Sequence, residues 1–237
     1  MRRFSIVFGL LLMFISTMTV GAEEASMDRV LKFAQNNIQW MGNAALKISG
    51  ESTTLYFDPL AGVKEAQAGI ILITHSDPDH LYPEALKKLT GPDTVIVAPE
   101  ACVESAKILK PGDQMNVKGI PVEAVPAYSH EGIYHPKSKQ WVGYIVTVDG
   151  IRIYVAGDTN FIPEMKEVKA DIAILSIPGY AYAMDYEEAA KAALELKPKV
   201  AIPVHYKGVV TDPEAGELFK EEIGGKINVV ILPTKNF

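Results

Sequence analysis

The sequence has a single cysteine, Cys102, among 237 residues. One cysteine excludes a disulfide within the chain and a rubredoxin-like set of cysteine ligands. No histidine near it in the sequence would serve as a base, so the pattern does not indicate a thiol nucleophile. We expect Cys102 to pack as a small hydrophobic side chain.

Positive charge is scarce as well. The chain has 23 lysines and arginines against 29 aspartates and glutamates, a formal net charge of −6. This balance gives no basic surface for phosphate groups, so we expect neither nucleic acid nor an anionic membrane surface as a partner. A small-molecule substrate is expected instead, and the sequence does not indicate an oligomeric state.

Charged residues are absent from residues 4–22. Two arginines precede this stretch, its centre is apolar, and small residues end it at Ala22. The pattern predicts a secretory signal peptide over residues 1–22, which leaves a single domain over residues 23–237 in the periplasm or outside the cell. The alternative is an uncleaved membrane anchor, because the apolar run is near the shortest length that spans a bilayer.

Short apolar runs rich in β-branched residues predict a series of strands. They cover Ala45–Ser49, Thr53–Asp58, Gly69–Thr74, Thr94–Ala98, Pro121–Val125, Trp141–Val148, Arg152–Ala156, Ile172–Ile177, Val200–Val204 and Asn228–Leu232. Helices are expected near Met27–Gln35, Pro83–Leu89, Ala101–Leu109, Ala189–Leu196 and Pro213–Ile223. Asp185 and Glu188 form a capping-box pattern before the fourth of these helices. The mixture predicts an α/β domain of two sheets with helices on the outside.

Four potential metal ligands follow the apolar strand that ends at Thr74. They are His75, Asp77, Asp79 and His80. Side chains at the end of a strand are held rigidly and face a loop region, where binding sites commonly lie. A helix cap would explain one aspartate here, but it does not require two histidines. The spacing therefore predicts a metal site.

Further histidines and aspartates follow other predicted strands. These residues are Asp58, His130, His135, Asp158 and His205. Taken alone, Asp158 would fit a turn and His205 a core position, but imidazoles and carboxylates at several strand ends can converge on one point. That mixture of ligands suits zinc, manganese or iron.

The order of these motifs resembles the metallo-β-lactamase fold superfamily, whose signature is His-x-His-x-Asp-His, a later histidine, an aspartate and a final histidine. Within it, Trp141–Tyr144, Gly150–Thr159 and Ile202–Tyr206 resemble the L-ascorbate-6-phosphate lactonase-like branch. The resemblance implies a four-layer αβ/βα sandwich with a metal cleft at the strand ends.

The resemblance also implies roles for these residues. His75 and the later histidine would hold one divalent ion, with Asp77 in place of the second histidine of the signature. Asp79, His80 and His205 would hold a second ion, Asp158 would bridge the two, and Asp58 would support the cluster from behind. The later histidine is either His130 or His135, and the motif favours His135.

Asp77 departs from the family signature, because an imidazole is usual there. A carboxylate favours harder ions such as manganese, iron or magnesium, although zinc remains the expected ion. It would equally explain a first metal position that binds weakly or stays empty. Both alternatives follow from the same substitution.

The function that the resemblance implies is a metal-dependent hydrolase. Two divalent ions would provide an activated hydroxide, and Asp158 and Asp79 would take part in catalysis by positioning it and transferring protons. The expected substrate is a small ester-like molecule, a lactone or a phosphoester. The alternative is a non-catalytic metal- or ligand-binding protein with a degenerate first metal site.

Overall fold

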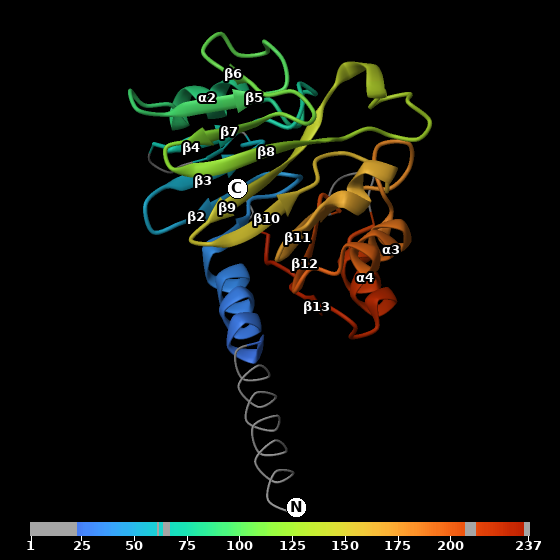
Figure 1. Cartoon of the computed structure of the whole chain (residues 1–237). Helices are drawn as coiled ribbons and strands as arrows, with labels where there is room; N and C mark the ends of the chain where they lie inside the picture. Colours follow the sequence, from blue (N-terminus) through green and yellow to red (C-terminus); the bar gives the residue numbers. More distant parts are fainter. Residues whose placement is uncertain (1–22, 61, 64–66, 207–211, 235–237) are drawn as a thin grey trace, which may run out of the picture.

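The computed structural model describes residues 23–60, 62–63, 67–206 and 212–234 (Figure 1). The predicted signal peptide therefore lies outside the described residues. Within the described part, no helix is both long and apolar enough to cross a membrane.

One sheet holds the first half of the chain. Its six strands lie in sequence order: β1 (Ile38–Trp40), β2 (Leu46–Ser49), β3 (Thr54–Phe57), β4 (Ile70–Leu72), β5 (Val95–Ala98) and β6 (Lys107–Ile108). The first three strands are antiparallel, and β3 to β6 are parallel. The carboxyl ends of β3 and β4 therefore meet at the same edge of this sheet.

The second sheet has seven strands, in the order β13-β12-β11-β10-β9-β8-β7. They are β7 (Gln114–Val117), β8 (Ile120–Pro126), β9 (Val142–Val148), β10 (Ile151–Val155), β11 (Ile172–Ser176), β12 (Val200–Val204) and β13 (Asn228–Val229). Strands β7 to β10 form an antiparallel meander, and β10 to β13 run parallel. The carboxyl ends of β10, β11 and β12 thus share one edge.

Helices α2 (Pro83–Leu89), α3 (Tyr186–Leu196) and α4 (Ala215–Ile223) cover the outer faces of the sheets, with 3₁₀ turns η1 (Lys137–Lys139) and η2 (Pro163–Glu167). A further helix over residues 23–37 extends from the lower end of the sandwich in Figure 1, and its Val30, Phe33 and Ala34 belong to the core between the sheets. Figure 1 shows α3 and α4 beside β11 to β13, on the far side from the first sheet. The sandwich of two mixed sheets between helices confirms the predicted fold class.

Strand β4 shows how the layers are packed. Ile70 and Leu72 lie in the large core between the two sheets, whereas Ile71 and Ile73 lie in a smaller core that includes Leu89 of α2. Successive side chains of a strand point to opposite faces, so a strand that is buried on both faces is apolar throughout. This burial explains the unbroken apolar run before the metal-ligand cluster.

The predicted strands are confirmed, with differences of a few residues at their ends, and three strands, β1, β6 and β7, were missed. β1 and β6 are short, and β7 is mostly exposed and polar. The predicted helix over Ala101–Leu109 is wrong. Residues 101–105 form bends and turns, and Lys107–Ile108 pairs with β5 as β6. Pairing at the edge of the sheet outweighs the weak local helix preference there.

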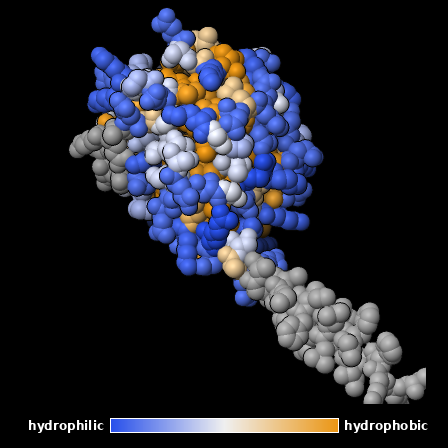
Figure 2. Space-filling view, turned by 60° about the vertical axis from the view of Figure 1, so that its left-hand side comes forward, coloured by the Kyte–Doolittle hydropathy of each residue, from blue (hydrophilic) through white to orange (hydrophobic). Residues whose placement is uncertain are grey.

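Hydrophilic side chains cover most of the surface. On the face drawn in Figure 2 they surround a band of hydrophobic residues. Large hydrophobic side chains that are individually exposed are few in the described part of the chain: Ile108, Ile133, Tyr134 and Tyr180. Three of these four belong to loops after β8 and β11, at the same edge as the predicted metal ligands.

Candidate metal centre

The predicted ligands converge at the edge where parallel strands of both sheets end. The loop after β4 supplies His75, Asp77, Asp79 and His80, and the second sheet supplies His135, Asp158 and His205 from the segments after β8, β10 and β12. The four histidines and Asp158 are buried, whereas the side chains of Asp77 and Asp79 are 35% and 52% exposed. The two exposed carboxylates therefore mark the side from which solvent reaches the centre.

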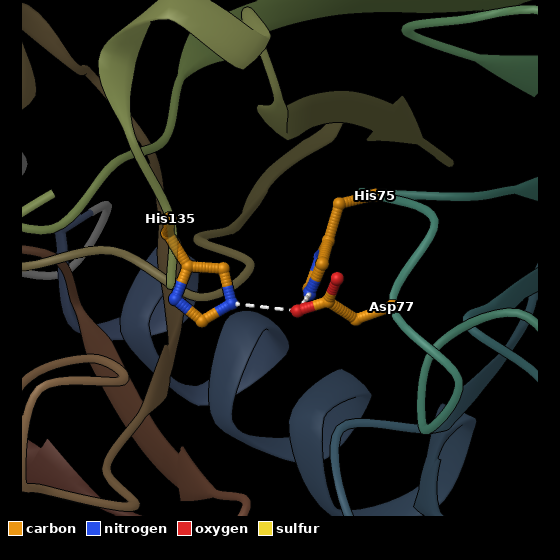
Figure 3. Close-up of side chains that lie close together, drawn as sticks. All are labelled: His75, Asp77 and His135. Atoms are coloured by element: carbon orange, nitrogen blue, oxygen red, sulfur yellow. Dashed lines mark ion pairs between the residues drawn. The ribbon is translucent and has the colours of Figure 1, made fainter. Parts of the chain in front are cut away.

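His75, Asp77 and His135 form the first group of ligands (Figure 3). Asp77 Oδ2 lies 3.3 Å from His135 Nε2 and 3.7 Å from His75 Nε2. The two imidazoles are perpendicular, with their centroids 5.0 Å apart, and both lie against the indole of Trp141. Two ring nitrogens thus face one carboxylate oxygen, and the indole of Trp141 packs behind both imidazoles.

Asp79, His80 and His205 form the second group. Asp79 Oδ2 lies 3.8 Å from His80 Nε2 and 3.6 Å from His205 Nε2. This arrangement repeats that of the first group, with two ring nitrogens facing a partly exposed carboxylate.

Asp158 lies between the two groups. Its Oδ2 is 3.4 Å from His80 Nε2 and 4.0 Å from His135 Nε2, so one oxygen faces a histidine of each group. Its Oδ1 accepts a hydrogen bond of 2.6 Å from Ser176 Oγ and lies 3.1 Å from His205 Nδ1. A carboxylate placed in this way can bridge two ions.

The buried ring nitrogens provide a test of whether a metal fits. Nε2 of His75 and Nε2 of His80 have no hydrogen-bond partner within the described residues, although both are buried. Leaving a buried polar atom unpaired costs about 1–3 kcal/mol, so such atoms call for a partner. Imidazole and carboxylate ligands suit zinc, manganese or iron, and the site fits two divalent cations.

Hydrogen bonds on the far side of each ring fix which nitrogen faces the centre. Asp58 accepts from Thr74 Oγ1 at 2.6 Å and lies 2.9 Å from His80 Nδ1. Because the Thr74 hydroxyl donates to Asp58, it must accept from His75 Nδ1, 2.9 Å away. Both rings therefore carry their proton on Nδ1, which leaves the lone pair of Nε2 for a metal.

Asn43 and Ser176 also support the site, and sequence reasoning did not identify them. Asn43 Nδ2 donates to Asp79 Oδ2 at 3.0 Å, and its carbonyl accepts from the backbone N–H of His205 at 2.9 Å. Asn43 has a φ of +47°, a conformation that asparagine tolerates better than most residues. The Gly-Asn pair in the sequence could have marked Asn43 as a turn residue. The sequence gives no such signal for Ser176, the last residue of β11.

When no metal is bound, neighbouring opposite charges and burial determine which side chains of the cluster are protonated. Burial disfavours the charged form of His80, but the carboxylates of Asp158 and Asp58 raise the pKa of His80 well above its usual value. Burial likewise opposes ionisation of Asp158, yet His205 and His80 hold the pKa of Asp158 well below its usual value. Burial lowers the pKa of His75. Without a metal, the protonated form of His80 is therefore favoured beside an ionised Asp158, whereas His75 is held neutral, and a bound cation would take the place of the His80 proton.

Comparison with known proteins identifies the family. A model of the β-lactamase superfamily domain matches residues 37–205, which include every predicted ligand. The chain belongs to the β-lactamase superfamily. Relatives named UPF0173 metal-dependent hydrolases occur in Thermococcus onnurineus and Methanopyrus kandleri. They are 32% and 31% identical, and the alignments cover 82% of this chain and 95% and 96% of theirs.

Two solved structures are also similar to this chain. A structure assigned as a metal-dependent hydrolase from Parabacteroides distasonis is 36% identical, with a TM-score of 0.76 over 84% of this chain and 93% of that one. A metallo hydrolase from Ignicoccus hospitalis, 22% identical over 84% of this chain and 95% of its own, has the same fold with a TM-score of 0.69. The chain is a metal-dependent hydrolase. Its likeness to the lactonase branch stays a prediction, since these names give no substrate.

Of the two histidines after β8, His135 lies within the candidate ligand groups and His130 lies outside them. His135 is buried against Asp77, whereas the exposed His130 side chain has its Nε2 3.2 Å from Glu188 Oε1. Glu188 also accepts from Asn160 Nδ2 at 2.7 Å and from the backbone N–H of Phe161 at 2.9 Å. His130 thus links the loop that carries His135 to Glu188 of α3.

The bonds of Glu188 correct one half of the predicted capping box. Asp185 accepts from the backbone N–H of Glu188 at 2.7 Å, as predicted for the N-cap of α3. The Glu188 carboxylate is used elsewhere, because Asn160 and Phe161 offer it two donors near the metal centre. The first turn of α3 therefore supports the site rather than its own helix cap.

Proposed function

We propose that this protein is an exported hydrolase of small ester-like bonds, a lactone or a phosphoester, that works with two divalent cations. The observation that carries the proposal is the position of Asp158, whose Oδ2 faces His80 on one side and His135 on the other. A bridging carboxylate between two ligand groups is typical of a dinuclear hydrolytic centre. Zinc is the expected ion, and manganese or iron are the alternatives, because the carboxylate of Asp77 suits these harder ions better than an imidazole would.

When bound, the cations supply a water of lowered pKa and a Lewis acid that polarises the oxygen of the scissile bond. The chain's own residues position this chemistry. Asp158 is fixed by Ser176 Oγ at 2.6 Å, and Asp58 and Thr74 orient the rings of His80 and His75. Prior orientation of this kind reduces the reorganisation needed in the transition state.

Asp79 has the position of a proton-transfer group. Its side chain is about half exposed, and its Oδ2 lies within 4 Å of both histidines of the second group. The imidazole of His205, with Nε2 3.6 Å from Asp79 Oδ2, is the main reason that the pKa of Asp79 is far below its usual value, so the carboxylate is ionised at neutral pH. Asn43 fixes its orientation by a hydrogen bond of 3.0 Å.

The test begins with metal content, measured by elemental mass spectrometry on the protein that starts at Glu23. Close to two equivalents of metal are expected, with loss in an Asp158→Ala, His205→Ala double variant. His130→Ala is the matched control, since this histidine lies outside the ligand groups, and it should keep both ions. Hydrolysis of a lactone and phosphoester panel then tests the substrate class.

The second candidate function is a non-catalytic metal-binding protein, and Asp77 is the observation that favours it. This ligand of the first group is 35% exposed and replaces the usual imidazole. A single equivalent of metal together with no hydrolysis of any panel member would support this alternative and contradict the dinuclear hydrolase.

Export is proposed from the pattern of residues 1–22. The test is expression of the full chain in a bacterium, followed by mass spectrometry of the protein in the periplasmic and membrane fractions. A soluble periplasmic protein that begins at Glu23 is the expected result. An intact chain found only in the membrane fraction would contradict cleavage and indicate an anchor.

A further inference from the structure

Exposed apolar side chains gather on two loops beside the metal centre. Ile133 and Tyr134 lie in the loop after β8 and are 64% and 49% exposed, and Tyr180 lies in the loop between β11 and α3. Single exposed apolar residues are common on any protein surface. A group of them beside a polar centre is instead typical of a ligand site.

Tyr134 and Tyr182 connect the two loops by stacking. Their ring centroids are 4.6 Å apart and the ring planes are inclined by 29°. Tyr134 directly precedes His135, a member of the first ligand group. The loop that carries Tyr182 follows β11, whose last residue, Ser176, donates to Asp158 Oδ1 at 2.6 Å. The stacked pair therefore joins two loops that both begin at the candidate metal centre.

Tyr180 is separate from this pair although it is only two residues from Tyr182. Its side chain is 81% exposed, and it borders a cavity of about 270 Å³ together with Ile177, Asp185 and Ala215. The loop after β11 thus offers two different apolar surfaces. One is the stacked pair next to the ligands, and the other is the cavity on the side of α3 and α4.

The geometry of the stacked pair limits what would bind there. Two rings that already stack, with centroids 4.6 Å apart, offer a flat apolar surface that a further ring can extend in an offset arrangement. Asp77 and Asp79 would be neutralised by the cations that they hold, so the reacting ester or phosphate group can lie at the centre while a planar ring lies against the pair. The surface therefore favours a flat, uncharged group beside the reacting bond.

We propose that Tyr134 and Tyr182 form an aromatic wall that binds a neutral planar ring of the substrate, adjacent to the bond that is hydrolysed. This inference rests on the proposed function, and it narrows the substrate class to aryl-substituted lactones or phosphoesters. Tyr182 is then a specificity-determining residue. It acts on substrate binding rather than on the chemical step.

The experiment compares two pairs of substrates that differ only in planarity. One pair is a δ-lactone with a phenyl or a cyclohexyl group on the carbon bonded to the ring oxygen, and the other is benzyl phosphate and cyclohexylmethyl phosphate. The metal-loaded protein should have the lower KM for the aromatic member. Tyr182→Leu should raise that KM by roughly 2- to 12-fold, the contribution of one aromatic pair, with kcat and the cyclohexyl KM little changed.

Two further variants separate stacking from other effects. Tyr182→Phe keeps the ring and should keep the preference for the aromatic substrate. Tyr180→Leu removes an exposed tyrosine of the same loop outside the stack and should also keep it. Equal losses on both substrates in Tyr182→Leu, or loss of the preference in Tyr180→Leu, would overturn the proposal, and the second result would favour the cavity.

Failure of the proposed function gives a different result. If the metal-loaded protein hydrolyses no substrate of either pair, the proposed substrate class is wrong, and calorimetry with the matching phenyl and cyclohexyl δ-lactams tests the wall alone. Tighter binding of the phenyl lactam, lost in Tyr182→Leu, supports the wall. Equal binding of the two lactams overturns it.

Discussion

Nδ1 of His80 lies 2.9 Å from Oδ2 of Asp58, a buried carboxylate at the end of the neighbouring strand β3. Asp58 also accepts from both the backbone N–H and the hydroxyl of Thr74, so three donors surround it. Asp58 has a φ of +42°, which brings its side chain back beneath the ligand loop. The contact joins two parallel strands through the ring that faces the metal centre.

Asp58→Asn should weaken metal binding by about 10- to 100-fold, because His80 loses the carboxylate that orients its ring and increases its basicity. Asparagine tolerates the positive φ, so the fold should persist. Competition with a coloured chelator measures the affinity. Asp171→Asn is the matched control at a carboxylate remote from the centre, and a similar loss in both variants would contradict the assigned role.

Asp77→His should shift the metal preference of the first group toward zinc. An imidazole replaces a harder carboxylate, and softer nitrogen ligands disfavour manganese and iron relative to zinc. The ratio of zinc to manganese after reconstitution with an equal mixture measures the shift. An unchanged ratio would indicate that Asp77 is not a ligand.

Metal affinity should fall as the pH is lowered from 8 to 6. The carboxylates of Asp158 and Asp58 raise the pKa of His80, and Asp158 raises the pKa of His205, in both cases against the effect of burial. These imidazoles hold protons in the metal-free protein, and each must lose one to coordinate an ion. Calorimetric titrations in buffers of different ionisation enthalpy should detect proton release, and its absence would contradict the ligand assignment.

Asp171→Asn should lower the free energy of unfolding of the metal-free protein by about 1 kcal/mol at pH 7. Asp171 accepts from Lys199 Nζ at 2.8 Å and from the backbone N–H of Arg152 at 3.0 Å. Burial raises the pKa of Asp171, but the hydrogen bonds from Lys199 and the Arg152 backbone, together with the positive charges of these two residues, lower the pKa below its usual value.

The pH dependence of this effect follows from the lowered pKa. A carboxyl whose pKa falls on folding stabilises the protein above its unfolded pKa of about 3.9, and that contribution is lost as the pH falls through the folded value. Urea titrations in the presence of a chelator should therefore find a smaller gap between variant and parent at pH 3 than at pH 7. A constant gap would exclude the charge as its cause.

The two tryptophans should report on different halves of the centre. Trp141 lies 4.8 Å from His75 and 5.6 Å from His135, centroid to centroid. Trp40 donates to the carbonyl of Asn43 at 2.6 Å, on the side of the second group. In Trp40→Phe, only Trp141 remains, and its fluorescence should be quenched as Co²⁺ binds to the first group. In Trp141→Phe, Trp40 should be quenched as Co²⁺ binds to the second group. Identical titration curves for the two variants would contradict two separate metal positions.

The strands and the ligand cluster could be predicted because burial leaves a direct trace in the sequence. Strand β4 is apolar on both faces, so His75 at its end is easily recognised. The contacts of Asn43 and Ser176 could not be predicted in this way, because they join segments that meet only in the folded sheets; the Gly-Asn turn marked Asn43 as a turn residue and not as a partner of Asp79. Residues 101–109 were misassigned for the same reason, since only the available edge of β5 decides their conformation.

The ligands are divided between the two halves of the chain, with four residues from the loop after β4 and three from the second sheet. Neither half can therefore complete either group unaided: the first requires His135 and the second requires His205. The complete centre exists only where the two sheets are packed together, so an ion bound there is held by both of them. An ion held by ligands from both halves would then slow their separation. The rate at which the folded enzyme unfolds would therefore depend on the concentration of free metal ions.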